Sequence, residues 1–149
     1  MRIRDVYTPH ARTATRDEPL AGAAQMMCSE HIGALVVVDR ADSKRRPVGI
    51  VTDRDIVRGQ LRRATDLYCL TVGDVMTPDP LVLPAHLELT EAIDALNARA
   101  VRRAPVLDPD GSLAGIVTLD DLMPAVAQEL TDLATLMGSQ AHRERARSR

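Results

Sequence analysis

The chain of 149 residues carries 19 basic residues (Lys and Arg) against 21 acidic ones (Asp and Glu). This balance argues against a dedicated nucleic-acid-binding protein, which carries a basic surface. The chain has no Trp, no Phe and two Tyr, so it lacks the aromatic side chains on which single-stranded nucleic acids stack, and its core has to be aliphatic.

Membrane segments and metal sites are not indicated by the sequence. No apolar run approaches the roughly 20 residues of a membrane helix, and residues 1–6 lack the apolar stretch of a signal peptide. We therefore expect a cytoplasmic protein that does not contact a membrane. Cys28 and Cys69 stand outside any CxxC spacing, which predicts free thiols. The four histidines have no ligand spacing, so no metal ion is expected.

The chain contains an internal repeat. Residues 3–9 (IRDVYTP) recur as residues 72–78 (VGDVMTP), at a shift of 69. Residues 49–52 (GIVT) recur as residues 115–118, at a shift of 66. The difference of three residues falls within residues 40–47, where a loop can absorb it.

The first copy predicts five elements in chain order. A short strand is expected at residues 13–15. Apolar residues at positions i, i+3, i+4 and i+7 then form one face of a helix: Leu20, Ala23, Ala24 and Met27. Buried strands are expected at residues 35–38 and 48–52, and a second helix follows Thr52.

The second copy predicts the same order of elements. A strand at residues 81–83 precedes a helix whose apolar face contains Leu89, Ala92, Ile93 and Leu96. Two strands joined by a Pro-Asp-Gly turn follow, and then the last helix. Pro124 falls inside that helix, where it removes a hydrogen bond, so we expect a kink or a later start.

The repeats define the expected fold class, α/β (α+β), with two β-α-β-β-α units packed in pseudo-two-fold symmetry. A unit of about 60 residues buries too little surface to be stable alone, so the two should share a core. The expected boundaries are repeat 1 at residues 1–63, a linker at 64–71, repeat 2 at 72–130, and a basic tail at 131–149. Because the periodic pattern fades beyond Leu130, we expect the tail to be partly disordered.

A Thr-x-x-Asp signature follows the Gly-Ile-Val strand in both copies, as Thr52 with Asp55 and as Thr118 with Asp121. The start of a helix has unpaired backbone N–H groups that attract phosphate. The same spacing also forms a capping box, in which the Thr and the acid satisfy the helix end without any ligand. Both interpretations stay open at this point.

The sequence resembles the family of cystathionine-β-synthase (CBS) domains. The resemblance rests on four segments and covers about residues 1–130: 49–55 (GIVTDRD), 74–78 (DVMTP), 102–108 (RRAPVLD) and 115–121 (GIVTLDD). It implies two repeats paired into a Bateman module, with two clefts that hold AMP, ADP, ATP or S-adenosyl compounds such as S-adenosylmethionine. It also implies a homodimer.

The resemblance implies roles for the signature residues. Asp121 and Asp55 would accept hydrogen bonds from ribose hydroxyls, and Thr118 and Thr52 would contact ribose or phosphate.

The remaining implied contacts are to phosphate and adenine. A basic residue before the Pro-Val strand would contact phosphate, which points to Arg103 and Arg102 of the second copy. The expected adenine-lining residues are Leu81, Val82 and Ile116 in one copy and Thr13 and Ile50 in the other.

Enzymatic activity is not expected. The sequence has no Walker A or GxGxxG motif and no readable catalytic triad, so we assign no catalytic residue, cofactor or metal. The first hypothesis is a regulatory module that binds an adenine nucleotide and acts as a metabolite sensor on an unidentified regulated protein. The alternative is an interaction or scaffold protein of the same fold that binds no nucleotide. Because only the second copy has the arginines, we expect Asp121 to matter more for binding than Asp55.

Overall fold

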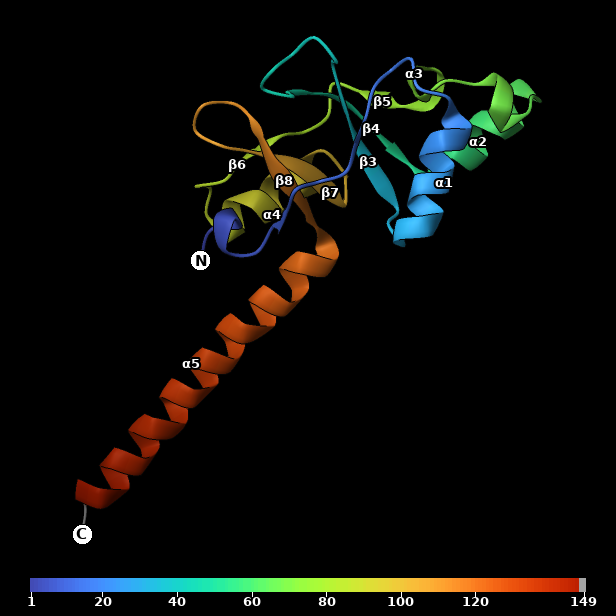
Figure 1. The fold of residues 1–149 in the computed structure, drawn as a ribbon. Helices are drawn as coiled ribbons and strands as arrows, with labels where there is room; N and C mark the ends of the chain where they lie inside the picture. Colours follow the sequence, from blue (N-terminus) through green and yellow to red (C-terminus); the bar gives the residue numbers. More distant parts are fainter. Residues whose placement is uncertain (148–149) are drawn as a thin grey trace.

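The structure, a computed structural model, describes the backbone of residues 1–147 and the side chains of residues 1–140. It contains two four-stranded sheets, which lie side by side in Figure 1. The first sheet consists, in spatial order, of β2 (Thr13–Ala14), β3 (Ala34–Val38), β4 (Pro47–Thr52) and β5 (Thr77–Pro78). The second consists of β6 (Leu83–Pro84), β7 (Arg103–Leu107), β8 (Leu113–Thr118) and β1 (Thr8–Pro9).

Four of the five described α-helices begin where the sequence predicts a helix, whereas the short helix at Val72–Val75 was not predicted. The α-helices are α1 (Leu20–Glu30), α2 (Asp53–Arg63), α3 (Val72–Val75), α4 (Leu89–Ala98) and α5 (Leu119–Arg147). Two 3-10 turns, η1 (Ile3–Asp5) and η2 (Leu67–Cys69), complete the described elements. Among the described helices, none is long and apolar enough to cross a membrane.

The two sheets have matching strand pairings. In each, the short strand runs parallel to the first long strand, and the two long strands form an antiparallel hairpin. Leu35 lies opposite Val51 in one hairpin, and Ala104 lies opposite Val117 in the other. All four side chains are buried, and so is Val36, the neighbour of Leu35 on the opposite face of its strand, which explains why that strand is apolar on both faces.

The opening segments of the two repeats are exchanged between the sheets. β1 pairs with β8 of the second repeat, with Thr8 opposite Ile116, and β5 pairs with β4 of the first repeat, with Thr77 opposite Ile50. The buried Ile3 accordingly belongs to the second repeat's core. The expected boundaries, residues 1–63 and 72–130, delimit the two copies along the chain. In space, however, each sheet has one edge strand, β1 or β5, that comes from the other copy.

A glycine in each copy permits this close exchange. A Cβ atom at Gly115 would lie 2.2 Å from the carbonyl oxygen of Thr8, and one at Gly49 would lie 2.7 Å from the Sδ atom of Met76. Real Cβ contacts are essentially never shorter than 3.0 Å. The glycine of the Gly-Ile-Val-Thr segment therefore leaves room for the opening segment of the other copy.

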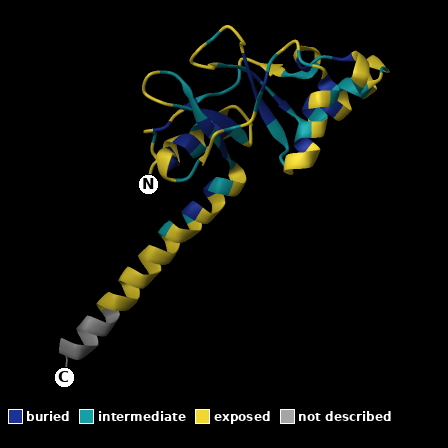
Figure 2. Cartoon of the chain, viewed as in Figure 1, coloured by how far each residue is buried: buried dark blue, intermediate teal, exposed yellow. Residues whose placement is uncertain are grey.

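The last helix differs from the prediction. It begins directly after Thr118, contains Pro124 and extends to Arg147, whereas the sequence predicted that the pattern would end near Leu130. Figure 1 shows α5 projecting from the body, and Figure 2 shows that its outer part is exposed. Helix-forming residues such as Ala, Leu, Met and Gln sustain it without a covering layer. Residues 148–149 of the predicted tail lie outside the described residues.

Candidate functional site

Thr52 and Asp55 form a reciprocal cap at the start of α2. The Asp55 amide donates to Thr52 Oγ1 at 3.2 Å, while Asp55 Oδ2 accepts from the Thr52 amide and hydroxyl, both at 2.9 Å. The capping box expected from the Thr-x-x-Asp spacing is therefore present.

Thr118 and Asp121 make the equivalent contacts at the start of α5. Asp121 Oδ2 accepts from the Thr118 amide and hydroxyl, both at 2.8 Å. Its other oxygen, Oδ1, accepts from the Thr8 hydroxyl at 3.3 Å. The Oδ1 atom of Asp55 accepts no hydrogen bond from a described residue. Since capping uses only Oδ2, a cap and a ligand contact can coexist in the same carboxylate.

The Asp55 cleft, as we name it, is a hollow of about 410 Å³ at the start of α2. It combines the end of β4, the start of α2 and Thr77 with the segment that precedes β7 in the other repeat. Its lining residues are Ile50, Thr52, Asp53, Arg54, Asp55, Arg58, Thr77, Ala100, Val101, Arg102 and Arg103.

The Asp121 cleft is its pseudo-symmetric counterpart, with a volume of about 510 Å³. It combines the end of β8, the start of α5 and Thr8 with the segment that precedes β3. Its lining residues are Thr8, His10, Ala11, Arg12, Glu30, Ile32, Gly33, Ala34, Arg103, Ile116, Thr118, Asp120 and Asp121.

The structure distributes most of the predicted site residues over these two clefts. The Asp55 cleft contains Ile50, Thr52, Asp55, Arg102 and Arg103. The Asp121 cleft contains Ile116, Thr118, Asp121 and again Arg103.

Three predicted adenine contacts line neither cleft in the described part of the chain. Leu81 is half-buried against the core of the second repeat, and Val82 is half-buried beside it in sequence. Thr13 accepts a hydrogen bond from Arg45 Nη2 at 2.8 Å. These positions precede or begin the short parallel strands, whose packing the sequence pattern did not reveal.

The placement of Arg102 corrects the grouping made from the sequence. The sequence assigned both arginines to the copy that contains Asp121, but Arg102 lines the Asp55 cleft and Arg103 reaches both. The reason is that each cleft joins the Thr-x-x-Asp segment of one repeat to the strand entry of the other.

Several lining residues were not predicted from the sequence. Thr8 and Thr77 are equivalent positions of the two openings, and the repeat alignment could have found them. Arg58 lies one helical turn after Arg54, which the (i, i+4) spacing on one helix face could have indicated. Arg12 and Glu30 gave no sequence signal, because they meet only through the tertiary fold.

The two clefts differ in charge. The Asp55 cleft is lined by four arginines and two aspartates. The Asp121 cleft is lined by two arginines and three acids, and Arg12 already forms an ion pair with Glu30. A phosphate is therefore better matched by the Asp55 cleft. No group of three or more His, Cys, Asp or Glu residues with metal-binding geometry occurs among the described residues.

Comparison with known proteins identifies this arrangement. A family model described as the CBS domain matches the chain twice, over residues 3–62 and 72–128. The chain belongs to the CBS domain family. The tandem CBS repeats and the mixed α/β fold that the sequence predicted are thus confirmed.

Two similar proteins match most of this chain. An uncharacterized 17.7 kDa protein of Acidianus ambivalens is 32% identical over 135 residues, covering 91% of this chain and 76% of its own. CBSX2, a CBS-pair protein of Arabidopsis thaliana, has been solved in complex with AMP. That complex has a TM-score of 0.71 and 29% identity, and the match covers 85% of this chain and 96% of that one.

Other relatives place the CBS pair in different settings. The CBS pair of protein MJ0100, solved with 5'-methylthioadenosine and S-adenosyl-L-methionine, has a TM-score of 0.75 but 20% identity, which shows the fold alone. That match covers 87% of this chain and 98% of the other. The inosine-5'-monophosphate dehydrogenase of Thermoplasma acidophilum is 33% identical over 121 residues, but the chain spans 22% of that enzyme. No catalytic domain is evident in the described part of this chain.

Proposed function

We propose that this CBS pair is a regulatory module that binds an adenine nucleotide in the Asp55 cleft and acts as a metabolite sensor. The observation that carries the proposal is the Asp55 carboxylate. One oxygen caps α2, while the other is free of hydrogen bonds from described residues in a cleft that holds four arginines. A free carboxylate oxygen can accept hydrogen bonds from ribose hydroxyls, and guanidinium groups suit phosphate.

The Asp121 cleft suits an adenosine compound without phosphates. Its three acids outnumber its two arginines, and Thr8 already donates to Asp121 Oδ1. A ligand of the S-adenosylmethionine class carries a positive sulfonium and would tolerate these acids better than a nucleotide would. We therefore propose AMP, ADP or ATP as the ligand of the Asp55 cleft and an S-adenosyl compound as the ligand of the Asp121 cleft.

Isothermal titration calorimetry with AMP, ADP, ATP and S-adenosylmethionine tests the proposal. We expect saturable binding of at least one adenine nucleotide by the purified chain. If none of the four compounds binds, the acids serve only as helix caps, and the alternative of a scaffold protein of the same fold replaces the sensor.

The partner in assembly is proposed to be a second copy of this chain, held through α5. One side of α5 has apolar residues at alternating spacings of four and three: Leu119, Met123, Val126, Leu130, Leu133 and Met137. Val126 is half-buried against the second core, and the others are exposed. Leu130, Leu133 and Met137 are 63%, 59% and 72% exposed. Two antiparallel copies would place Leu119 against Met137, Met123 against Leu133, and Val126 against Leu130.

Charge supports the antiparallel direction. Residues 120–132 contain four acids and no base. A parallel pair would place Asp120 and Asp121 of one helix beside the same acids of the other, whereas the antiparallel register places them beside residues 135 and 136, which are uncharged.

The setting of the module is also part of the proposal. We place it in the cytoplasm, acting on an unidentified regulated protein, without nucleic acid and without a catalytic activity of its own. The support for a regulated protein comes from relatives such as the inosine-5'-monophosphate dehydrogenases. This chain matches only 22% of such an enzyme, so there the matching segment is one part of a longer chain that has an enzymatic activity.

A further inference from the structure

A row of arginines runs along one face of α2. Arg54, Arg58 and Arg62 are four residues apart, so they lie on the same side of the helix. Successive members are separated by about 6 Å along the helix axis. All three are exposed, and none forms an ion pair with an acid whose side chain the structure describes.

A second hollow continues the Asp55 cleft along this row. We call this hollow, of about 380 Å³, the outer groove; it lies between α2 and the segment from α3 to β5. It shares Asp55, Arg58 and Thr77 with the Asp55 cleft, so the two hollows adjoin along α2. Its lining residues are Asp55, Arg58, Gly59, Arg62, Arg63, Asp74, Val75, Met76, Thr77 and Pro78.

The outer groove keeps a positive charge despite Asp74. The Thr71 amide and hydroxyl donate to Asp74 Oδ2 at 2.8 and 3.0 Å. These bonds, with a smaller contribution from Arg63, lower the pKa of Asp74 below its ordinary value. The charged Asp74 lies 3.7 Å from an Arg63 nitrogen and offsets that arginine, which leaves Arg58 and Arg62 to act on a ligand.

We propose that the physiological ligand of the Asp55 cleft is a nucleoside triphosphate, whose phosphate chain runs from the cleft into the outer groove along Arg58 and Arg62. The proposal rests on the proposed function, because the adenosine part has to bind at Asp55. A monophosphate held by Arg102 and Arg103 would leave the outer groove empty. A longer chain brings its additional negative charges to the arginines that lack acidic partners among the described residues.

Calorimetric titrations of the full chain with AMP, ADP and ATP test this assignment. We expect affinity to rise in that order, with ATP bound about fivefold to thirtyfold more tightly than AMP, as two exposed charge contacts would provide. Inorganic triphosphate serves as the probe without a nucleoside and should bind more weakly than ATP. Equal affinities for AMP and ATP, or for ATP and inorganic triphosphate, would overturn the inference.

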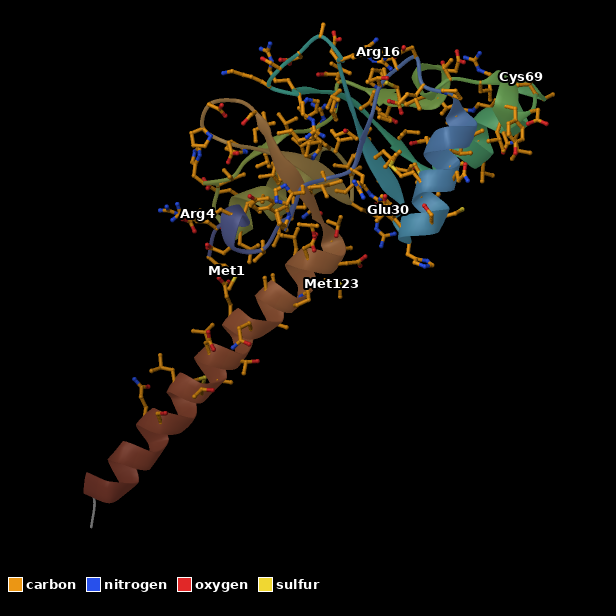
Figure 3. All side chains as sticks on the ribbon, in the orientation of Figure 1. Met1, Arg4, Arg16, Glu30, Cys69 and Met123 are labelled. Carbon is orange, nitrogen blue, oxygen red and sulfur yellow. The ribbon has the colours of Figure 1, made fainter. Side chains whose placement is uncertain are left out.

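The Arg62→Gln variant tests the outer groove directly, because Arg62 lines only this hollow and not the Asp55 cleft. Gln preserves helix propensity. The variant should bind ATP about twofold to fivefold more weakly and AMP as the parent does. Arg16→Gln, an exposed arginine outside both hollows (Figure 3), is the charge-matched control and should change neither affinity.

Failure of this inference is distinguishable from failure of the proposed function. If AMP binds but Arg62→Gln leaves the affinity for ATP unchanged, the outer groove is not a phosphate site, while nucleotide binding stands. If the parent binds neither AMP nor ATP, both proposals are wrong.

Discussion

A single carboxylate can serve two purposes in this protein because its oxygens face different partners. In both Thr-x-x-Asp segments, Oδ2 accepts hydrogen bonds from the amide and the hydroxyl of the Thr, and Oδ1 takes no part in those contacts. The sequence presented capping and ligand binding as competing explanations, since a spacing does not distinguish the two oxygens. The surroundings of Oδ1 differ between the two segments: it accepts a hydrogen bond from the Thr8 hydroxyl at Asp121, but none from a described residue at Asp55.

The two acids should affect different ligands. We expect Asp55→Ala to weaken AMP binding by about tenfold to a hundredfold or more, because hydrogen bonds to a charged group contribute about 1.5–3 kcal/mol. The sequence predicted the larger effect at Asp121, but Arg102 lies in the Asp55 cleft. Asp121→Ala is the matched control, since it also loses a cap, worth about 1 kcal/mol of folding stability. Titration calorimetry measures the affinity of both variants for AMP. A larger loss of affinity in Asp121→Ala than in Asp55→Ala would contradict the assignment of AMP to the Asp55 cleft.

Gly115 is expected to be required for the exchanged strand. In Gly115→Ala the new Cβ would collide with the backbone of Thr8, so β1 has to shift from β8, at a cost of about 1–3 kcal/mol in unfolding free energy. Gly22→Ala in α1 is the control, because a Cβ there meets no atom within 4 Å, and alanine stabilises a helix by about 1 kcal/mol relative to glycine. Urea denaturation measures both, and equal stabilities of parent and Gly115→Ala would show that β1 is not tightly held.

Sequence patterns predict some of the helices and strands of this fold but not the contacts between distant segments. The helix from Leu20 and the two long strands of each repeat follow from local periodicity and β-branched runs, and the structure contains them. The pairing of β1 with β8 is a contact between residues more than 100 positions apart, which no local pattern encodes. For the same reason the sequence placed Arg102 with the wrong signature. The length of α5 was missed although apolar residues continue at spacings of four and three from Leu119 to Met137, a helical period that a longer window of the sequence could have revealed.

The apolar side of α5 should hold two copies together. Light scattering at micromolar concentration is expected to give the mass of a dimer for the parent and a monomer for the Leu130→Gln, Leu133→Gln double variant. Both leucines are exposed in the isolated chain, so their replacement should not disturb the body. Thr135→Gln is the control: its hydroxyl bonds to the carbonyl of Thr131 on the polar side, and the dimer should persist. A monomeric parent would refute the interface.

The exchange of the opening segments and the pseudo-symmetry of the fold give the two clefts the same construction and one lining residue in common. Each cleft contains its own Thr-x-x-Asp segment, the opening Thr of one copy and the strand entry of the opposite copy. Arg103 lines both, so a ligand in one cleft can alter the arginine available to the other. This arrangement gives a sensor a physical route by which two different adenosine compounds would influence each other's binding.

The projecting end of α5 should be dispensable for folding of the body. From α5, only Leu122 and Ala125 are buried in the second core, and every described residue from Leu130 to Gln140 is exposed. Truncation after Gly138 preserves the apolar side through Met137, so the melting temperature should stay within about 2 °C of the parent, as for other surface changes. Truncation after Ala127 removes Leu130, Leu133 and Met137, and should yield a folded monomer. Calorimetric melting with light scattering tests both truncations. A fall of the first variant's melting temperature by more than about 5 °C would mean that residues 139–149 pack on the body, contrary to this account.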